Sequence, residues 1–156
     1  MRLSIGSDSA TEMTEALKRE LEERGHTLFL CGPLSLGEEN RDWPLVAEDV
    51  ARAVADGGVD EGIVCCWTGT GVSIAANKIP GIRCALVGDV ETARGARIYN
   101  HANVLALSLR ATPIPVMKEI LDAWFATSTD SGEARSEWNR EQVARVSALE
   151  AAAANK

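Results

Sequence analysis

The segment from Cys66 to Gly71 places a thiol just ahead of two glycines, where a short helix is predicted to begin. Gly69 and Gly71 have no side chain, so successive backbone N–H groups are exposed and can bind an anion. A thiol near a helix N-terminus has a pKa below its usual value of about 8.5, so Cys66 can act as a nucleophile or base near neutral pH. The spacing excludes a Walker loop, and a dinucleotide fingerprint would need a third glycine where Ile74 stands. The pattern therefore predicts a reactive thiol beside an anion-binding loop.

Two further segments, residues 6–9 and 99–103, carry polar side chains near predicted strand ends. In an open parallel sheet, ligands bind beyond the carboxyl ends of the strands, and we expect both segments to join the thiol loop there. Asp8 is either a substrate ligand or the solvated cap of the first helix. His101 is either an acid with a pKa near neutrality or the C-terminal cap of a helix. Arg110 follows the last strand on the same side and is a candidate for anion binding.

The elements that must position these side chains alternate along the whole chain, with short apolar runs followed by helical patterns. This alternation predicts right-handed βαβ units on a parallel sheet: an α/β, Rossmann-like three-layer sandwich. We expect one domain over residues 1–156, with a core over 1–126 and a C-terminal loop and helix over 127–156. Five strands are predicted at 3–7, 27–31, 61–67, 83–87 and 104–107.

Helices are expected between these strands. Ser9 and Glu12 have capping-box spacing, which predicts the start of the first helix, and Gly25 ends it. The later helices are predicted at about 42–56, 72–78, 90–99 and 112–124, with a last one before residue 156.

Composition excludes several classes of protein. The chain has 156 residues, of which 46% are hydrophobic, so we expect a folded rather than a disordered chain. A net charge of −7 argues against nucleic acid or a membrane surface as a partner, and any anionic substrate must be held locally. We find no apolar core of a signal peptide and no run of about 18 apolar residues, and therefore expect a cytoplasmic protein.

Four cysteines, Cys31, Cys65, Cys66 and Cys84, show no spacing suited to zinc, and we expect no metal. Cys65 and Cys66 point to opposite faces of one strand and are not expected to form a disulfide. Apart from Cys66, these thiols are interpreted as structural.

Residues 66–83 resemble the signature of the type B ribose-5-phosphate isomerases and galactose-6-phosphate isomerase subunits. Residues 6–8, 91–94 and 103–107 extend the resemblance over about residues 1–126. It implies a Rossmann-like fold and a homodimer or tetramer whose active sites are shared between subunits, with the C-terminal helix used in dimerisation. It also implies aldose–ketose isomerisation through an enediolate, with neither a metal nor an organic cofactor.

The resemblance also implies roles for individual residues. Cys66 matches the thiol that moves a proton between C1 and C2, and Thr68 with the amides of Gly69–Gly71 matches the group that stabilises the enediolate oxygen. Asp8 matches a carboxylate that orients the substrate, and Asn100 and Asn103 match as well, although Asn103 could simply shape a turn. The other candidate substrate-binding residues are Ser9, Trp67, Thr70, Ser73, Arg110, Arg135 and Arg140.

Departures from the family pattern affect the distal part of the site. Tyr99 stands where the family carries its ring-opening His, and His101 appears two residues later, so both are candidate catalytic residues. Trp67 replaces a glycine in the catalytic loop. Glu133 and Glu137 fall where two phosphate-binding arginines are usual, and Ser9 and Thr11 replace a His and a Gly.

Three functions are consistent with these residues. The first is isomerisation of a small pentose- or tetrose-phosphate-like sugar, with Arg135 and Arg140 restoring phosphate binding after a register shift. The second is isomerisation of an unphosphorylated or acidic sugar, with Trp43, Trp67 or Trp138 stacked on it. The third is binding of a sugar or nucleotide without catalysis. We favour the first, because the residues for proton transfer are intact.

Overall fold

A five-stranded parallel sheet forms the centre of the computed structural model, which describes residues 1–36 and 42–154. The strands lie in the order β2-β1-β3-β5-β4, and every neighbouring pair is parallel. This arrangement confirms the predicted sheet. The strands are β1 (Arg2–Ser7), β2 (Thr27–Cys31), β3 (Glu61–Cys66), β4 (Cys84–Leu86) and β5 (Val104–Ser108).

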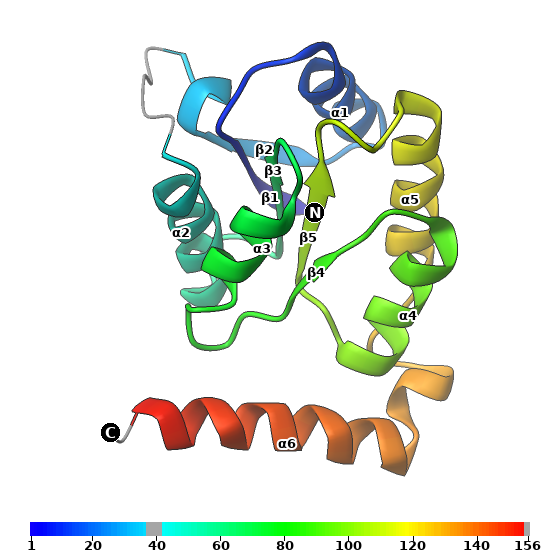
Figure 1. Ribbon diagram of the computed structural model, residues 1–156. Helices are drawn as coiled ribbons and strands as arrows, with labels where there is room; N and C mark the ends of the chain where they lie inside the picture. The colour runs from blue at the N-terminus through cyan, green and yellow to red at the C-terminus, as the bar shows by residue number, and fades with distance from the viewer. Residues whose placement is uncertain (37–41, 155–156) are drawn as a thin grey trace.

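Helices cover both faces of the sheet, as predicted for a three-layer sandwich (Figure 1). One apolar cluster joins the sheet to α1 (Glu12–Glu23), α4 (Val90–Asn100) and α5 (Ile114–Ala126). A second joins the opposite face to α2 (Trp43–Ala55) and α3 (Thr70–Ala76). The 3₁₀ helices η1 (Gly32–Leu34) and η2 (Gly132–Arg135) are short connections. The last helix, α6 (Glu137–Ala154), crosses below the end of the sheet where the strands begin.

The first helix begins later than predicted. Its N-cap is Thr11, whose hydroxyl accepts from the Thr14 N–H, while the Thr14 hydroxyl accepts from the Thr11 N–H at 2.8 Å. The capping box predicted from Ser9 and Glu12 is therefore wrong. Thr11 and Thr14 form the reciprocal pair instead, whereas the Ser9 carbonyl accepts from the Ser7 hydroxyl.

Two apolar clusters place the neighbouring thiols of β3 on opposite faces of the sheet, as predicted. Cys65 lies in the cluster under α1 and α5, and Cys66 in the cluster under α2 and α3. Burial raises the pKa of Cys65 far above its usual range and that of Cys84 to about 12. Both thiols are thus held protonated. None of the described helices has the length and apolarity needed to cross a bilayer.

The strand order places a topological switch point where β1 and β3 lie side by side. The chain leaves β1 toward β2 on one side, and the strands after β3 lie on the other side. The loops that follow β1 and β3 therefore diverge at the carboxyl edge, the edge at which the strands end. Open α/β sheets bind ligands at such a switch point.

Candidate active site

The carboxyl edge of the sheet brings together the segments that follow β1, β3 and β5. Ser7 pairs in register with Cys65, and Cys66 pairs with Ser108. Asp8 therefore lies one residue beyond the strand, level with Cys66, which is buried at the end of β3. The carboxylate and the thiol predicted from sequence thus reach the same edge of the sheet.

Hydrogen bonds from the segment after β5 fix the loop after β3. The Trp67 carbonyl accepts from the Ser108 hydroxyl at 2.9 Å and from the Arg110 N–H at 3.1 Å. The Cys66 carbonyl accepts from the Leu109 N–H at 2.9 Å. These bonds hold the backbone that directly follows the Cys66 side chain, so the start of the loop is preorganised. The Trp67 side chain is nevertheless 65% exposed.

Glycine is required at two positions of this loop. Gly69 is the N-cap of α3 with a φ of 76°, and a Cβ there would lie 2.5 Å from Leu86 Cδ1 and 3.0 Å from the Leu107 backbone carbon. A Cβ on Gly71 would lie 3.0 Å from the ring of Trp43. The helix starts at Thr70, two residues earlier than predicted, so the first N–H groups of α3 have no acceptor within the helix. They remain available to an anion.

Hydroxyls and a guanidinium surround the loop. The Thr68 and Thr70 hydroxyls lie 2.7 Å apart. Thr68 and Arg110 line one cavity of about 330 Å³ between the ends of β4 and β5, so Arg110 lies on the predicted side. Ser73 lies farther along α3, where its hydroxyl contacts the Cys84 thiol.

Asp8 is half-buried, and its Oδ1 atom is buried without a hydrogen-bond partner in the described residues. Burial raises the pKa of Asp8, and a hydrogen bond from the Ser9 side chain offsets this only in part. Because the first helix is capped by Thr11, Asp8 does not serve as its N-cap. A buried acceptor without a partner is typical of a position that a ligand completes.

The segment 99–103 lies at the opposite edge, and its predicted place at the carboxyl edge is wrong. Helix α4 runs antiparallel to the strands, so its C-terminal residues Tyr99 and Asn100 arrive at the amino edge, where β5 begins. His101 is the C-cap of α4, as one of the two interpretations predicted. Asn103 shapes the turn, because its side chain accepts from the Arg83 N–H and donates to the Gly81 carbonyl.

His101 faces a cavity of about 420 Å³ at this amino edge. Four arginines also line it, namely Arg83, Arg97, Arg135 and Arg140. Arg97 is paired with Glu61 at 2.7 Å and Arg135 with Asp130 at 2.5 Å. Arg140 forms no ion pair within residues 1–36 and 42–154. Arg135 and Arg140 therefore lie beside His101 at the amino edge of the sheet. Within one chain, Cys66 lies at the opposite edge.

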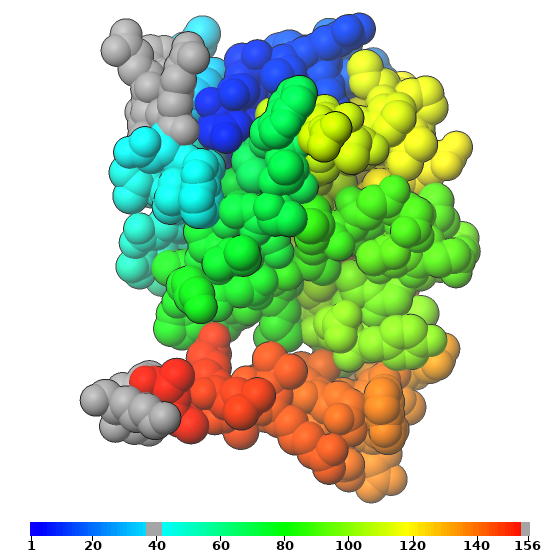
Figure 2. Space-filling view, viewed as in Figure 1, coloured from blue at the N-terminus to red at the C-terminus, as the bar shows by residue number. Residues whose placement is uncertain are grey.

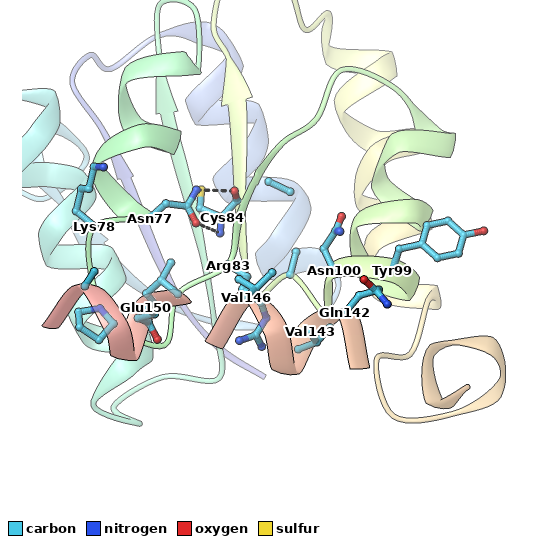
Figure 3. A pocket seen from close by; sticks show the side chains of 15 residues that line it. Asn77, Lys78, Arg83, Cys84, Tyr99, Asn100, Gln142, Val143, Val146 and Glu150 are labelled. Atoms are coloured by element: carbon cyan, nitrogen blue, oxygen red, sulfur yellow. Dashed lines mark hydrogen bonds between the residues drawn. The ribbon is translucent and has the colours of Figure 1, made fainter. Parts of the chain in front are cut away.

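Tyr99 and Asn100 line a different space, a groove of about 750 Å³ between α6 and the start of β4. Figure 2 shows this groove as a hollow between the orange-to-red helix and the green body. In Figure 3 the Tyr99 ring points away from the Asn77 and Cys84 pair, whose two hydrogen bonds are drawn. The two candidates for ring opening, Tyr99 and His101, thus face separate cavities.

Glu61, Arg97 and Trp124 form a buried polar cluster that the sequence analysis did not predict. The buried Glu61 carboxylate accepts from Trp124 Nε1 at 2.6 Å and pairs with Arg97, whose guanidinium also lies over the Trp124 ring. Arg97 donates to the carbonyls of Ala102 and Thr127 as well, so this cluster anchors the segment that carries His101. Its only signal in the sequence is a charged residue that opens the otherwise apolar strand 61–66.

Among the described residues, no group of three or more His, Cys, Asp or Glu side chains is arranged to hold a metal ion. At its two edges, the sheet carries a thiol, hydroxyls, backbone amides, a carboxylate, a histidine and arginines.

Comparison with known proteins is consistent with this chemistry. Residues 3–142 match a family described as Ribose/Galactose Isomerase. The chain is 38% identical over 130 residues to ribose-5-phosphate isomerase B of Escherichia coli, covering 83% of each chain. It is 36% identical over 133 residues to D-erythrulose-4-phosphate isomerase of Pectobacterium atrosepticum, covering 85% of this chain and 87% of that protein. The structure of ribose-5-phosphate isomerase B from Clostridium thermocellum superimposes with a TM-score of 0.85 and 34% identity, covering 97% of this chain and 98% of the other.

Proposed function

The chain belongs to the ribose/galactose isomerase family, and from this premise we propose that it interconverts an aldose phosphate and a ketose phosphate of four or five carbons. The observation that carries the proposal is the Cys66 thiol at the end of β3, shortly before a glycine loop and the first N–H groups of α3, which have no acceptor within the helix. A base beside preorganised N–H donors is the arrangement that an enediolate intermediate requires.

The reaction moves one proton from C2 to C1 and another from O2 to O1, and it needs no oxidant. The Cys66 thiolate removes the proton from C2 of the open-chain aldose, and the C2–H electron pair forms a C1=C2 double bond while negative charge develops on O1. The thiol returns the proton to C1 as O2 loses its own proton to O1, which gives the ketose. The Thr68 hydroxyl and the N–H groups of Gly69–Gly71 stabilise the negative oxygen, and each such donor contributes about 3 kcal/mol in comparable sites.

Replacement of the base tests this step. Cys66→Ala is expected to lower turnover of ribose 5-phosphate or erythrose 4-phosphate by about 10²–10⁴-fold and to abolish deuterium exchange at C2 in heavy water. Cys84→Ala is the matched control, because its thiol is held protonated by burial and lies outside the loop. Unchanged exchange in Cys66→Ala would exclude this residue as the base.

We further propose that two subunits share each active site, with Cys66 of one subunit completed by His101 and Arg140 of its partner. The support is that these groups lie at opposite edges of the sheet within one chain. Helix α6 also presents exposed apolar side chains, Trp138 and Leu149, which suit a subunit contact.

Subunit mixing tests this sharing. Cys66→Ala and His101→Asn subunits, each inactive on a ring-forming substrate, are expected to regain about one quarter of wild-type activity when co-assembled, because a hybrid dimer holds one intact site. If both residues served the same site within one chain, the mixture would stay inactive.

The proposed phosphate-binding residues are Arg135 and Arg140, which line the ≈ 420 Å³ cavity. Guanidinium groups bind phosphate through paired N–H donors. Comparing ribose with ribose 5-phosphate separates this proposal from the second function, isomerisation of an unphosphorylated sugar. Equal kcat/KM for the two compounds would favour the unphosphorylated substrate.

We propose that the enzyme works in the cytoplasm. The support is chemical: its four cysteines form no disulfide, although they lie in one small chain, and cysteines remain reduced in that compartment. Mass-spectrometric mapping of thiols in protein isolated under alkylating conditions tests this placement, since a disulfide would contradict it.

A further inference from the structure

His101 has an uncommon backbone conformation. It is the one non-glycine residue with a positive φ among residues 1–36 and 42–154, at 47°. Left-handed backbone is strained for a residue with a side chain and persists where surrounding contacts impose it. Residues with such a backbone conformation cluster at functional sites, where surrounding contacts impose it.

Arg83 holds the backbone of this segment. Its Nε donates to the His101 carbonyl at 3.0 Å, and its N–H donates to Asn103 Oδ1 at 2.8 Å. The Arg83 carbonyl accepts in turn from the Asn103 N–H at 3.1 Å. Three hydrogen bonds therefore join Arg83 to residues 101–103, and Arg83 also lines the cavity that His101 faces.

The Ala134 carbonyl holds the imidazole ring, because His101 Nε2 lies 2.8 Å from this oxygen. A carbonyl can only accept, so Nε2 carries the hydrogen, and in the neutral ring Nδ1 keeps its lone pair. Ala134 is buried, and its turn is fixed by Asn139 Nδ2, which donates to the Glu133 carbonyl at 2.7 Å. Nδ1 forms no hydrogen bond with the described part of the chain.

We propose that Arg83 and Ala134 fix His101 as the Nε2–H tautomer, so that His101 Nδ1 is the atom that opens the sugar ring, with Arg83 as its positioning residue. This inference rests on the proposed isomerase function. Nδ1 takes the proton of the anomeric hydroxyl as the C1=O1 double bond forms and the C1–O4 bond breaks. The same proton then passes to O4, so the step consumes none. Tyr99 faces the other groove and has no part in this step.

Two substrates separate ring opening from isomerisation. Ribose 5-phosphate closes a five-membered ring through O4, whereas erythrose 4-phosphate carries its phosphate on O4 and cannot. His101→Asn is expected to lower kcat/KM about 10²-fold for ribose 5-phosphate and by a much smaller factor for erythrose 4-phosphate, and Asn tolerates left-handed backbone. Arg83→Met is expected to cause a loss of about tenfold on ribose 5-phosphate alone, and Arg83→Lys a smaller one.

Nitrogen-15 NMR of the imidazole gives a readout that does not depend on turnover. The wild-type protein is expected to show the Nε2–H pattern for His101, and Arg83→Met a mixture of tautomers. Arg94→Met is the matched control, because Arg94 lies exposed on α4 and pairs with Glu91. Tyr99→Phe should leave both substrates unaffected.

Three results would overturn the proposal: the Nδ1–H tautomer in the wild-type protein, equal losses on both substrates, or a selective loss in Tyr99→Phe. Inactivity of the wild-type protein on both sugar phosphates would instead contradict the proposed function. The tautomer measurement would still test the positioning by Arg83 and Ala134 in that case.

Discussion

The two edges of the sheet carry functional groups that are built in different ways. At the carboxyl edge, the Cys66 loop depends on strand ends, glycine backbone and main-chain hydrogen bonds between neighbouring segments. At the amino edge, His101 and the arginines come from α4, η2 and α6, and long side chains such as Arg83 and Arg97 hold them in place.

The carboxyl edge and the amino edge should therefore tolerate different substitutions. A site made of backbone is fixed by local conformation, so a single added methyl group can block it. A site held by side chains depends on distant partners, so its weak points lie outside the residues that would touch substrate. Variants at the two edges should therefore lose stability and activity in different proportions.

Glu61→Ala is expected to have the largest effect on stability. It leaves the buried Arg97 guanidinium without its carboxylate and Trp124 Nε1 without its acceptor. Loss of one partner from a buried pair costs about 3–5 kcal/mol, measured as the free energy of unfolding in urea. Glu91→Ala, which breaks the exposed pair with Arg94, is the control and should change stability by less than about 1 kcal/mol. Similar small losses in both variants would show that the amino edge does not depend on this buried pair.

Gly69→Ala is expected to damage the carboxyl edge with a smaller loss of stability. The left-handed φ of 76° costs about 1–3 kcal/mol for a residue with a side chain, and the new Cβ meets Leu86 and the Leu107 backbone. We expect kcat to fall about 10²-fold, because the amides around the intermediate shift. Gly81→Ala is a matched control: it has a φ of 83° but open space at its Cβ, so it should lose stability without the same loss in kcat. Parallel losses in kcat would mean that the loop itself is not the catalytic element.

This contrast also explains how much of the molecule could be predicted from sequence. The strands and the Gly69 loop follow from alternation and from short motifs, because neighbouring residues determine them. Ser9 was wrongly assigned as the cap because Thr11 and Thr14 offer a better reciprocal pair. Segment 99–103 was placed at the wrong edge because its polar residues were treated as following a strand, whereas they close a helix that runs antiparallel to the sheet.

The amino edge could not be predicted because its contacts join residues far apart in the chain. Trp124 contacts Glu61 across 63 positions, and the ring of His101 meets Ala134 across 33. No local pattern encodes which carbonyl an imidazole or guanidinium will reach. The resemblance to the family identified the residue types and implied active sites shared between subunits, but it did not place segment 99–103 at the amino edge.

Asp8→Asn is expected to raise stability while it lowers activity, unlike the variants above. Burial raises the folded-state pKa of Asp8, so folding favours its protonated form, and this favourable contribution is lost as pH rises through that pKa. The charged carboxylate therefore opposes folding at neutral pH. Because Asp8 is only partly buried and solvent screens its charge, we expect a small rise in Tm that is larger at pH 8 than at pH 4. A gain that is the same at both pH values would contradict this explanation, and Asp60→Asn, which breaks the exposed pair with Arg2, should instead lower Tm.

Glu150→Ala is expected to have the smallest effect on activity, and it tests how the amino edge depends on α6. The Glu150 carboxylate accepts from the Gly81 N–H at 2.9 Å and lies on the same groove as Arg83. Loss of this contact should cost about 0.5–1.5 kcal/mol and release the far end of the helix that carries Arg140. We therefore expect KM for the sugar phosphate to rise about twofold with kcat unchanged, because chemistry at Cys66 is not involved. Glu141→Ala, exposed on the same helix beside Arg145, should leave KM unchanged. A fall in kcat instead would mean that the two edges are coupled through α6 and are not independent halves.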